Sequence, residues 1–162
     1  MFGRRHVPDS VRGVALDPGE RRASWGVTAS GDPVVATTLG LRLPGTPGRV
    51  DWPDVEKASW QRPQLEIAEV AEVSGTGRRW RFELAEEGDL PDVVRSRVSA
   101  SVGWTTHVAL EPAGGVRLVG RRRPGLDVLD WQLVYDQGTD RHDPALQAQA
   151  QAALVDARRT VG

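Results

Sequence analysis

The sequence predicts a mainly β protein of the α+β class, an antiparallel barrel or sandwich with two helices. Much of the chain between Glu20 and Tyr135 alternates apolar and polar residues with the period of two that a half-buried strand requires. Clusters of Gly and Pro interrupt this alternation at short intervals, which favours antiparallel over parallel strands. Two segments, near 90–102 and 143–161, have helical spacing instead.

The first part of the chain leads into two predicted strands. Residues 1–18 lack periodicity, so we expect a loose leader. In "RASWGVT", Ala23, Trp25 and Val27 share one face. After the turn "SGDP", the run "VVATTLGLRLP" is predicted as one strand that bends most easily at Gly40.

The middle of the chain continues as short strands separated by corners. Pro53 makes "DWPD" a corner, because proline fixes its own φ and has no amide donor. Strands follow in "VEKASW", "QLEIAEVAE" and "RRWRFEL", with "SGTG" at 74–77 as a hairpin turn. About six strands therefore precede the first helix. We expect five tryptophans in phase with apolar neighbours to be substantially buried: Trp25, Trp52, Trp60, Trp80 and Trp131.

Two helices and three more strands complete the predicted order. Asp89 is a candidate N-cap of the helix near 90–102. Strands resume in "THVALEP", "GVRLVGRRRP" and "LDWQLVY". Asp143 is expected to cap the last helix and Pro144 to open it.

The run "GERRASWGVTASGDPVVATTLGLRLPGTPGRVDWPDVEKASW" resembles the bacterial PH-like and GRAM-like barrels, and also a group of uncharacterised small actinobacterial proteins. The resemblance covers about residues 19–102 and implies a strongly bent antiparallel barrel that a helix closes at one end. Two features depart from it. A PH barrel has seven strands before its capping helix, where six are counted here, and residues 103–162 have no counterpart.

We therefore expect a single PH-like domain over 19–162, with a β-β-β-α elaboration from about 103 to 162. Either the helix near 90–102 caps the barrel and the remainder is an addition, or that helix is an insertion and the final helix is the cap. The first hairpin turn, "TASGDP", has one acid and no base, so no standard phosphoinositide site is expected.

Composition excludes several classes of function. The formal net charge is −1, which produces no long-range field that would favour nucleic acid, so we expect no nucleic-acid partner. There is no cysteine, which excludes disulfides and thiolate chemistry. No apolar run is long enough to span a membrane, and we expect a cytoplasmic protein. Twenty arginines against one lysine indicate GC-rich codons, as in an actinobacterium.

The strongest candidates for a ligand or partner contact are arginines. "GRRRPG", 120–125, is the densest basic run, either an anion or acidic-partner contact or a solvated hairpin end. Arg79 and Arg81 lie on the outer face of their predicted strand and could extend the patch. Trp104, at a helix-to-strand junction, is the tryptophan to examine for exposure. The candidate contact residues are Arg79, Arg81, Arg121, Arg122, Arg123 and Trp104.

No pattern in the sequence indicates catalysis. The G-x-S-x-G motif is absent, and "DRHD" at 140–143 is interpreted as a helix cap rather than a metal site, because the other histidines are far away in sequence. We expect no catalytic residues, no metal and no cofactor.

The leading hypothesis is a non-enzymatic interaction module that binds a protein or peptide through a groove or an exposed strand edge. The alternative is a binder of a small anionic ligand or lipid headgroup at the barrel mouth, which would allow peripheral contact with a membrane. The pattern indicates neither the partner nor the oligomeric state.

Overall fold

The structure is a computed structural model that describes residues 5–71, 77–123 and 126–161. The chain divides into two compact units, Met1–Ala100 and Ser101–Gly162. Residues 103–162, for which the sequence predicted an elaboration of a single domain, lie in the second unit. Most of the "SGTG" turn predicted at 74–77 lies outside the described residues.

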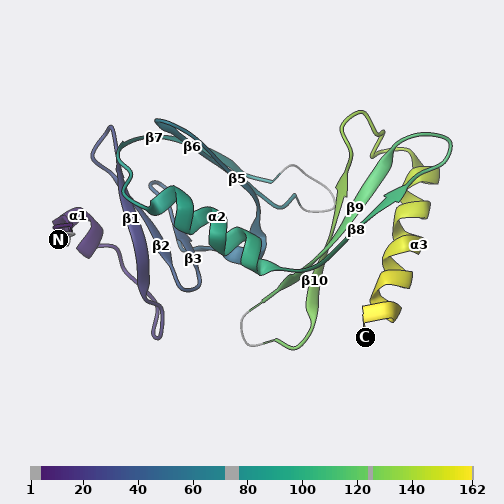
Figure 1. Ribbon diagram of the computed structural model, residues 1–162, viewed down its shortest axis with the longest axis horizontal. Coiled ribbons are helices and arrows are strands. Elements are labelled where there is room, and N and C mark those ends of the chain that lie inside the picture. The colour runs from purple at the N-terminus through teal and green to yellow at the C-terminus, as the bar shows by residue number, and fades with distance from the viewer. Residues whose placement is uncertain (1–4, 72–76, 124–125, 162) are drawn as a thin grey trace. The chain divides into compact units, whose positions relative to one another are not determined.

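Ten strands and three α-helices make up the described chain (Figure 1). In the first unit they are α1 (Asp9–Arg12), β1 (Arg22–Thr28), β2 (Pro33–Thr37), β3 (Gly40–Arg42), β4 (Val50–Asp51), the 3-10 turn η1 (Trp52–Asp54), β5 (Val55–Gln61), β6 (Gln64–Glu69), β7 (Arg79–Glu86) and α2 (Leu90–Ser101). The second unit has β8 (Val102–Ala109), β9 (Gly115–Arg122), β10 (Leu129–Tyr135) and α3 (Pro144–Val161). The mainly β class and both predicted helices are confirmed.

The first unit is built on one antiparallel sheet in the order β4-β3-β2-β1-β7-β6-β5. Strands β1 to β4 and β5 to β7 each form a meander, and β1 joins the two groups by pairing with β7. Among the described residues the pairing does not close on itself, because β4 and β5 stand at the two ends of the order. The structure therefore has an antiparallel sheet where the sequence predicted a barrel or sandwich, and no closed barrel is observed.

The run from 34 to 44 is a hairpin and not the single strand that its alternation predicted. β2 and β3 pair antiparallel, with Val35 opposite Arg42. The Thr37 hydroxyl accepts the N–H groups of Leu39 and Gly40, at 3.1 Å each, and so satisfies the donors of a tight turn. A Cβ on Gly40 would lie 2.2 Å from the carbonyl oxygen of Val50, so only glycine lets β4 pass. The extra turn raises the count before α2 from six strands to seven.

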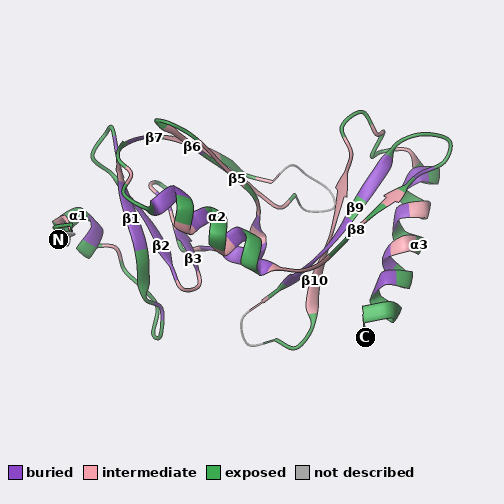
Figure 2. Cartoon of the chain, viewed as in Figure 1, coloured by how far each residue is buried: buried purple, intermediate pink, exposed green. Residues whose placement is uncertain are grey.

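The main core of the first unit lies between this sheet and α2. Leu90, Val94 and Val98 recur at helical spacing on one face of α2 and are buried (Figure 2). They share a core with Val34 near one end of the strand order and Leu65 near the other. A flat sheet could not bring both groups to one helix, so the sheet is curved around α2. Of the two helices that the sequence left open, α2 packs on this sheet.

The N-terminal segment covers part of the opposite face. Val11 in α1 is buried with Trp25 of β1 and Val35 of β2, in a small cluster separate from the main core. The expected leader is thus held to the sheet from residue 7, by Val7 and Val14 as well as Val11. Trp25 is buried as predicted, but on the face of the sheet turned away from α2.

A buried carboxylate connects the segment before β1 to two later strands. Arg42 of β3 donates two hydrogen bonds to Glu20, at 2.9 and 2.8 Å, and Arg49 donates one at 2.8 Å. The Glu20 side chain has no exposed surface. Asp17 also pairs with both guanidinium groups, and Asp51 pairs with that of Arg49. Burial raises the pKa of Glu20, but the hydrogen bonds from Arg42 and Arg49 outweigh it and the net pKa lies below the usual value.

The second unit is a three-stranded antiparallel sheet with α3 packed on one face. Residues in phase along β9, Val116 and Leu118, are buried against Leu146 and Ala150 of α3 (Figure 2). β8 begins at Val102, directly after α2, several residues before the strand that the sequence predicted. No helix among the described residues combines the length and apolar character that a membrane span needs.

The tryptophans follow the prediction only in part. Trp25 and Trp52 are buried, and the indole N–H of Trp52 donates to the carbonyl of Thr37 at 3.0 Å. Trp60 and Trp80 pack against the main core but remain half-buried, as does Trp131 in the second unit. The corner at Pro53 is therefore part of the core, and Trp52 is buried there whereas Trp60 is only half-buried.

We expect Glu20→Gln to destabilise the protein by roughly 3 kcal/mol near neutral pH, because it removes one partner of a buried ion pair. A group whose pKa is lowered on folding stabilises the fold above its unfolded pKa and loses this contribution as pH falls through its folded pKa. The difference between wild type and variant should therefore shrink below about pH 4.5, the ordinary value of this group. Urea unfolding at several pH values measures it, and a difference that stays constant down to about pH 3 would contradict this account.

Trp52→Ala is expected to lower the free energy of unfolding by about 4 kcal/mol, within the range for deletion of a buried aromatic ring. Trp60→Ala should cost clearly less, because its side chain is half-buried. Arg122→Ala, at an exposed position, serves as the control and should leave stability nearly unchanged. Equal losses for the two tryptophans would show that Trp60 carries more of the core than its burial indicates.

Candidate functional site

The candidate functional surface is the outer face of strands β5, β6 and β7 in the first unit. Along β7 the exposed arginines Arg79 and Arg81 alternate with Trp80 and Phe82, which pack against the core. The outward placement that the sequence predicted for Arg79 and Arg81 is thus observed. The prediction did not include a third cation, Lys57, which is exposed on β5.

Strand register places these three cations around one shallow groove. Lys57 of β5 is opposite Ala68 of β6, and Ala68 is opposite Arg79 of β7. In the next row on this face, Ser59 is opposite Glu66, which is opposite Arg81. The groove has a volume of about 290 Å³. Its lining residues are Lys57, Ser59, Glu66, Ile67, Ala68, Arg79, Trp80 and Arg81.

The charge in the groove is unevenly balanced. Arg81 pairs with Glu66 across the strands at 3.3 Å. Among the described residues, neither Lys57 nor Arg79 makes an ion pair. Because adjacent strands are about 4.8 Å apart, these two cations stand roughly 10 Å apart on either side of the small Ala68 side chain. Their long side chains can converge on an anion held above Ala68.

Beside this row, but outside the lining of the groove, Arg78 and Glu69 form an ion pair. Arg78 forms a two-pronged pair with Glu69, at 2.8 and 2.7 Å, and its guanidinium lies 4.9 Å from the centre of the Trp80 ring. The hydrogen bonds from Arg78 outweigh partial burial and lower the pKa of Glu69. Glu69 stays ionised and holds Arg78, so the charge available to a ligand comes from Lys57 and Arg79.

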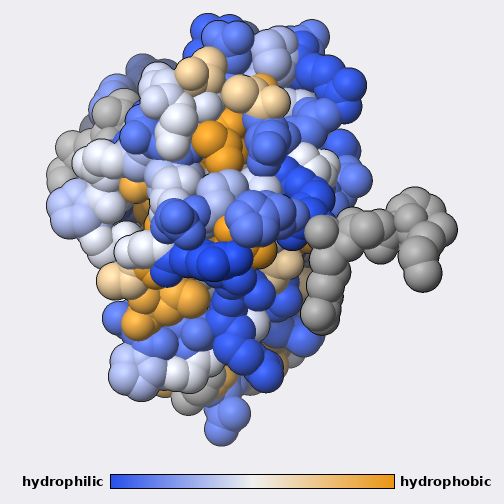
Figure 3. Space-filling view, turned by 90° about the vertical axis from the view of Figure 1, so that its left-hand side faces the viewer, coloured by the Kyte–Doolittle hydropathy of each residue, from blue (hydrophilic) through white to orange (hydrophobic). Residues whose placement is uncertain are grey.

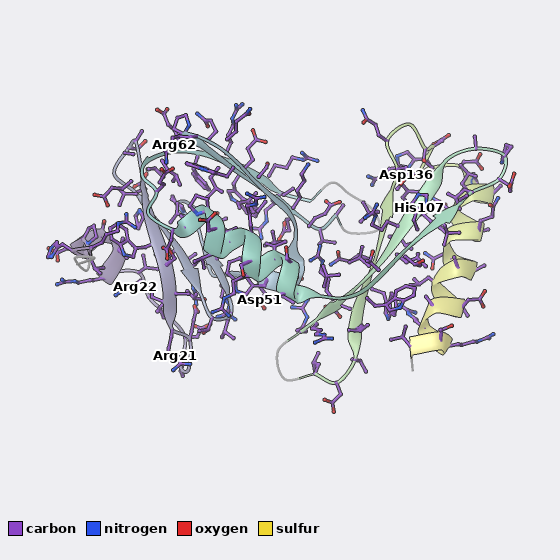
Figure 4. All side chains as sticks on the ribbon, viewed as in Figure 1. Arg21, Arg22, Asp51, Arg62, His107 and Asp136 are labelled. Atoms are coloured by element: carbon purple, nitrogen blue, oxygen red, sulfur yellow. The ribbon has the colours of Figure 1, made fainter. Side chains whose placement is uncertain are left out.

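β5 is also an edge of the sheet. It pairs with β6 and stands at the end of the strand order, so its second edge has no strand partner among the described residues. The β5–β6 hairpin turns at Arg62 (labelled in Figure 4) and Pro63, and Gln61 is opposite Gln64. In an antiparallel pair, the backbone N–H and C=O groups of every second residue point away from the neighbouring strand. Counted from the pair Gln61–Gln64, the groups of Ala58 and Trp60 are the ones that point away from β6. An extended segment could therefore pair with β5 beside the groove.

The arginine triplet that the sequence singled out does not form one patch. Arg121 is buried and donates to Ser101 Oγ at 2.8 Å and to Gln132 Oε1 at 3.0 Å. Arg123 pairs with Asp130 at 2.6 Å, and Arg122 is exposed. Successive residues of a strand point to opposite faces, which separates them. Arg121 and Arg123 are thus engaged within the fold, and of the three candidate contacts only Arg122 is fully exposed.

Trp104 is half-buried in the core of the second unit. Its ring meets that of Trp131 edge to face, with 5.3 Å between the ring centres. Both rings pack on the face of the sheet that α3 covers. Trp104 thus serves packing in the second unit, which argues against the contact role that the sequence suggested.

One pair of polar side chains was not predicted from the sequence. His107 Nε2 on β8 and Asp136 Oδ2, directly after β10, lie 2.6 Å apart, and both are partly exposed (Figure 4). A Cβ on Gly115 of β9 would lie 2.2 Å from Asp136 Oδ2 and 2.6 Å from His107 Nε2. The bare Cα of Gly115 therefore makes room for the pair. The two residues are 29 apart in sequence, so no local motif could reveal them.

The interpretation of "DRHD" as a cap is confirmed for Asp143. Its carboxylate accepts the N–H of Ala145 at 2.8 Å, at the start of α3. Across the described ranges, no three side chains of the metal-ligating types gather in one place.

We expect Gly115→Ala to destabilise the protein by about 1–3 kcal/mol, the usual cost of forcing a group into filled space. The nearest atoms to the new methyl group belong to His107 and Asp136. The cost should therefore fall to a few tenths of a kcal/mol in a His107→Ala, Asp136→Ala background. Thermal unfolding of the four proteins measures this coupling. Additive effects would show that the three residues do not share the space.

Comparison of the chain with protein-family models, curated proteins and solved structures yields no match. The groove and the edge of β5 are therefore the features that bear on function.

Proposed function

We propose that the protein is a non-enzymatic interaction module of the PH-like type, which binds an extended segment of a protein partner along β5. Its seven antiparallel strands followed by a helix support the resemblance, since a PH barrel has seven strands before its capping helix. The single observation that carries the binding mode is the position of β5. It is an edge strand, and its outer face leads directly into the groove between Lys57 and Arg79.

Main-chain hydrogen bonding suits an edge of this kind. β5 has seven residues, long enough for a segment of similar length to pair with it. Such pairing draws affinity from backbone groups and specificity from side chains on the two faces. Natural proteins usually blunt an edge that no partner uses, and a lysine is a common device. Lys57 prevents indiscriminate pairing and at the same time favours an acidic partner.

The surface chemistry also favours polar contact. On the face of the molecule in Figure 3, hydrophobic residues appear in small groups between hydrophilic ones. The large exposed apolar residues, Leu16, Leu126, Val128, Val155 and Val161, lie outside β5 to β7. A partner of this sheet would therefore be held by hydrogen bonds and charge more than by a broad apolar patch.

A display library of random peptides tests the binding mode. Peptides are selected on the wild type and counter-selected on Ala58→Pro, because proline removes the outward N–H of residue 58. We expect peptides that bind the wild type and lose at least tenfold in affinity with the variant. Circular dichroism and thermal unfolding show whether the variant is folded. If the variant is unfolded, hydrogen exchange of the wild-type amides tests the binding mode instead. Peptide binding should then slow exchange at the amides of Ala58 and Trp60. Peptides that bind both proteins equally, or leave these amides unprotected, would overturn the proposal.

A second candidate is a small anion or lipid headgroup bound in the groove itself. It is favoured by the two cations without ion pairs, Lys57 and Arg79, above the small Ala68 side chain. Inorganic phosphate, pyrophosphate and anionic vesicles should then raise the melting temperature in a dose-dependent way. The double variant Lys57→Ser, Arg79→Ser should abolish the shift. No shift with any of these probes would exclude this candidate.

A further inference from the structure

We infer that the segment bound by β5 alternates acidic and apolar residues, with an acidic side chain beside Lys57 and no acid near the hairpin end of the strand. This inference rests on the proposed function, because it describes the chemistry of the partner at the same edge. It follows from the two faces of β5 and from the charges that neighbouring strands place along them.

The outer face requires an anion at one position. A residue of an added strand opposite Lys57 would have its Cβ within about 5 Å of the Cβ of Lys57. Arg79 stands two strands further, across Ala68, and adds a second positive charge to the same row of this face. Neither cation makes an ion pair with a described residue. A carboxylate here gains Lys57 as a direct neighbour and the charge of Arg79 further along the row, without displacing an acid that is already bound.

The charge reverses along the same face toward the hairpin. After the row of Ser59, Glu66 and Arg81, which contains its own ion pair, the next row has Gln61, Gln64 and Glu83. Its only charge is negative. An acidic residue of the partner opposite Gln61 would face Glu83, and the cation of the hairpin turn, Arg62, is already paired with Glu87. The edge therefore selects a position for the acid and not merely a net negative charge.

The inner face requires apolar residues at the alternating positions. Ala58 and Trp60 point toward the core, but both are half-buried, so part of their apolar surface remains accessible. The residues of an added strand next to them would cover this surface and gain from its burial. Because successive side chains of a strand alternate between faces, the acidic and apolar requirements fall on alternate residues of one segment.

A second copy of this chain does not meet these requirements. In its regular part β5 presents Lys57, Ser59 and Gln61 on its outer face, and its one carboxylate, Glu56, lies in the register shift between Val55 and Lys57. Pairing of two copies of β5 centred on Ala58 would place Lys57 opposite Ser59 and not opposite a carboxylate. The structure therefore favours a different, acidic partner over self-association through this edge.

Fluorescence anisotropy with three labelled peptides tests the inference. Their central residues are Val-Glu-Val-Glu-Val, Val-Gln-Val-Gln-Val and Val-Lys-Val-Lys-Val, each between polar flanks. We expect the acidic peptide to bind about fivefold to tenfold tighter than the neutral one, and the basic peptide to bind weakest, at low salt. Added salt should reduce the preference.

Charge-reversal variants locate the preference. Lys57→Glu should invert the order of the acidic and basic peptides, and Arg79→Glu should weaken it. Arg95→Glu, an exposed arginine on α2 with the same change of charge, should leave the order as in the wild type. In the wild type, moving a single Glu from the position opposite Lys57 to the one opposite Gln61 should remove most of the gain.

Four outcomes would overturn the inference, and they separate it from the proposed function. If neutral and acidic peptides bind equally and both lose affinity with Ala58→Pro, the edge binds a strand but does not select acid. If the acidic peptide binds Ala58→Pro as well as the wild type, the groove binds the anion without strand pairing. If no peptide binds and the display selection also fails, the proposed function itself is wrong. Association of the chain with itself, abolished by Ala58→Pro, would replace the acidic partner by a second copy.

Discussion

Burial of one face of α2 is the constraint on which the first unit depends. Leu90, Val94 and Val98 together account for several kcal/mol of stability, at roughly 1.5–3 kcal/mol for each buried side chain. They must be covered by strands from both ends of the order, and this is possible only if the seven-stranded sheet curves. Short strands, the tight turn at Thr37 and the close passage of β4 over Gly40 serve this curvature. The buried Glu20, between Arg42 and Arg49, then attaches the N-terminal segment to the curved strands.

Curvature around a single helix also decides where the protein can bind. The concave side is occupied by the core, so a partner must use the convex face or an edge. β5 offers both, because its second edge has no strand neighbour in the described chain and its outer face adjoins the groove. Lys57 lies at this junction. Backbone hydrogen bonding along the edge does not depend on the partner's sequence, whereas a contact with Lys57 does. Lys57 therefore adds sequence preference to the backbone pairing.

The charged residues singled out from the sequence differ in burial and in position, and the reasons are physical. In "GRRRPG" the three arginines are adjacent, but a strand sends neighbours to opposite faces, which buries Arg121 and leaves Arg122 exposed. Lys57 and Arg79 are 22 positions apart in the sequence, yet register brings them to one row through Ala68. His107 and Asp136 meet in the same way, over a glycine on the intervening strand. Density of charge in the sequence was a poor guide to a site, because binding surfaces on a sheet are built across strands.

The sequence by itself determined the local elements: alternation marked the strands, helical spacing marked α2 and α3, and Asp143 marked the start of the last helix. These features depend on residues close in the chain, where side-chain period and turn chemistry act directly. It missed the β2–β3 hairpin, because the alternation continues through Thr37 and only a side-chain hydrogen bond reveals the turn. Strand order, the edge position of β5 and the groove between Lys57 and Arg79 were decided by the tertiary structure alone. They depend on which distant strands pair and in which register, and that is set by the shared burial of apolar faces around α2.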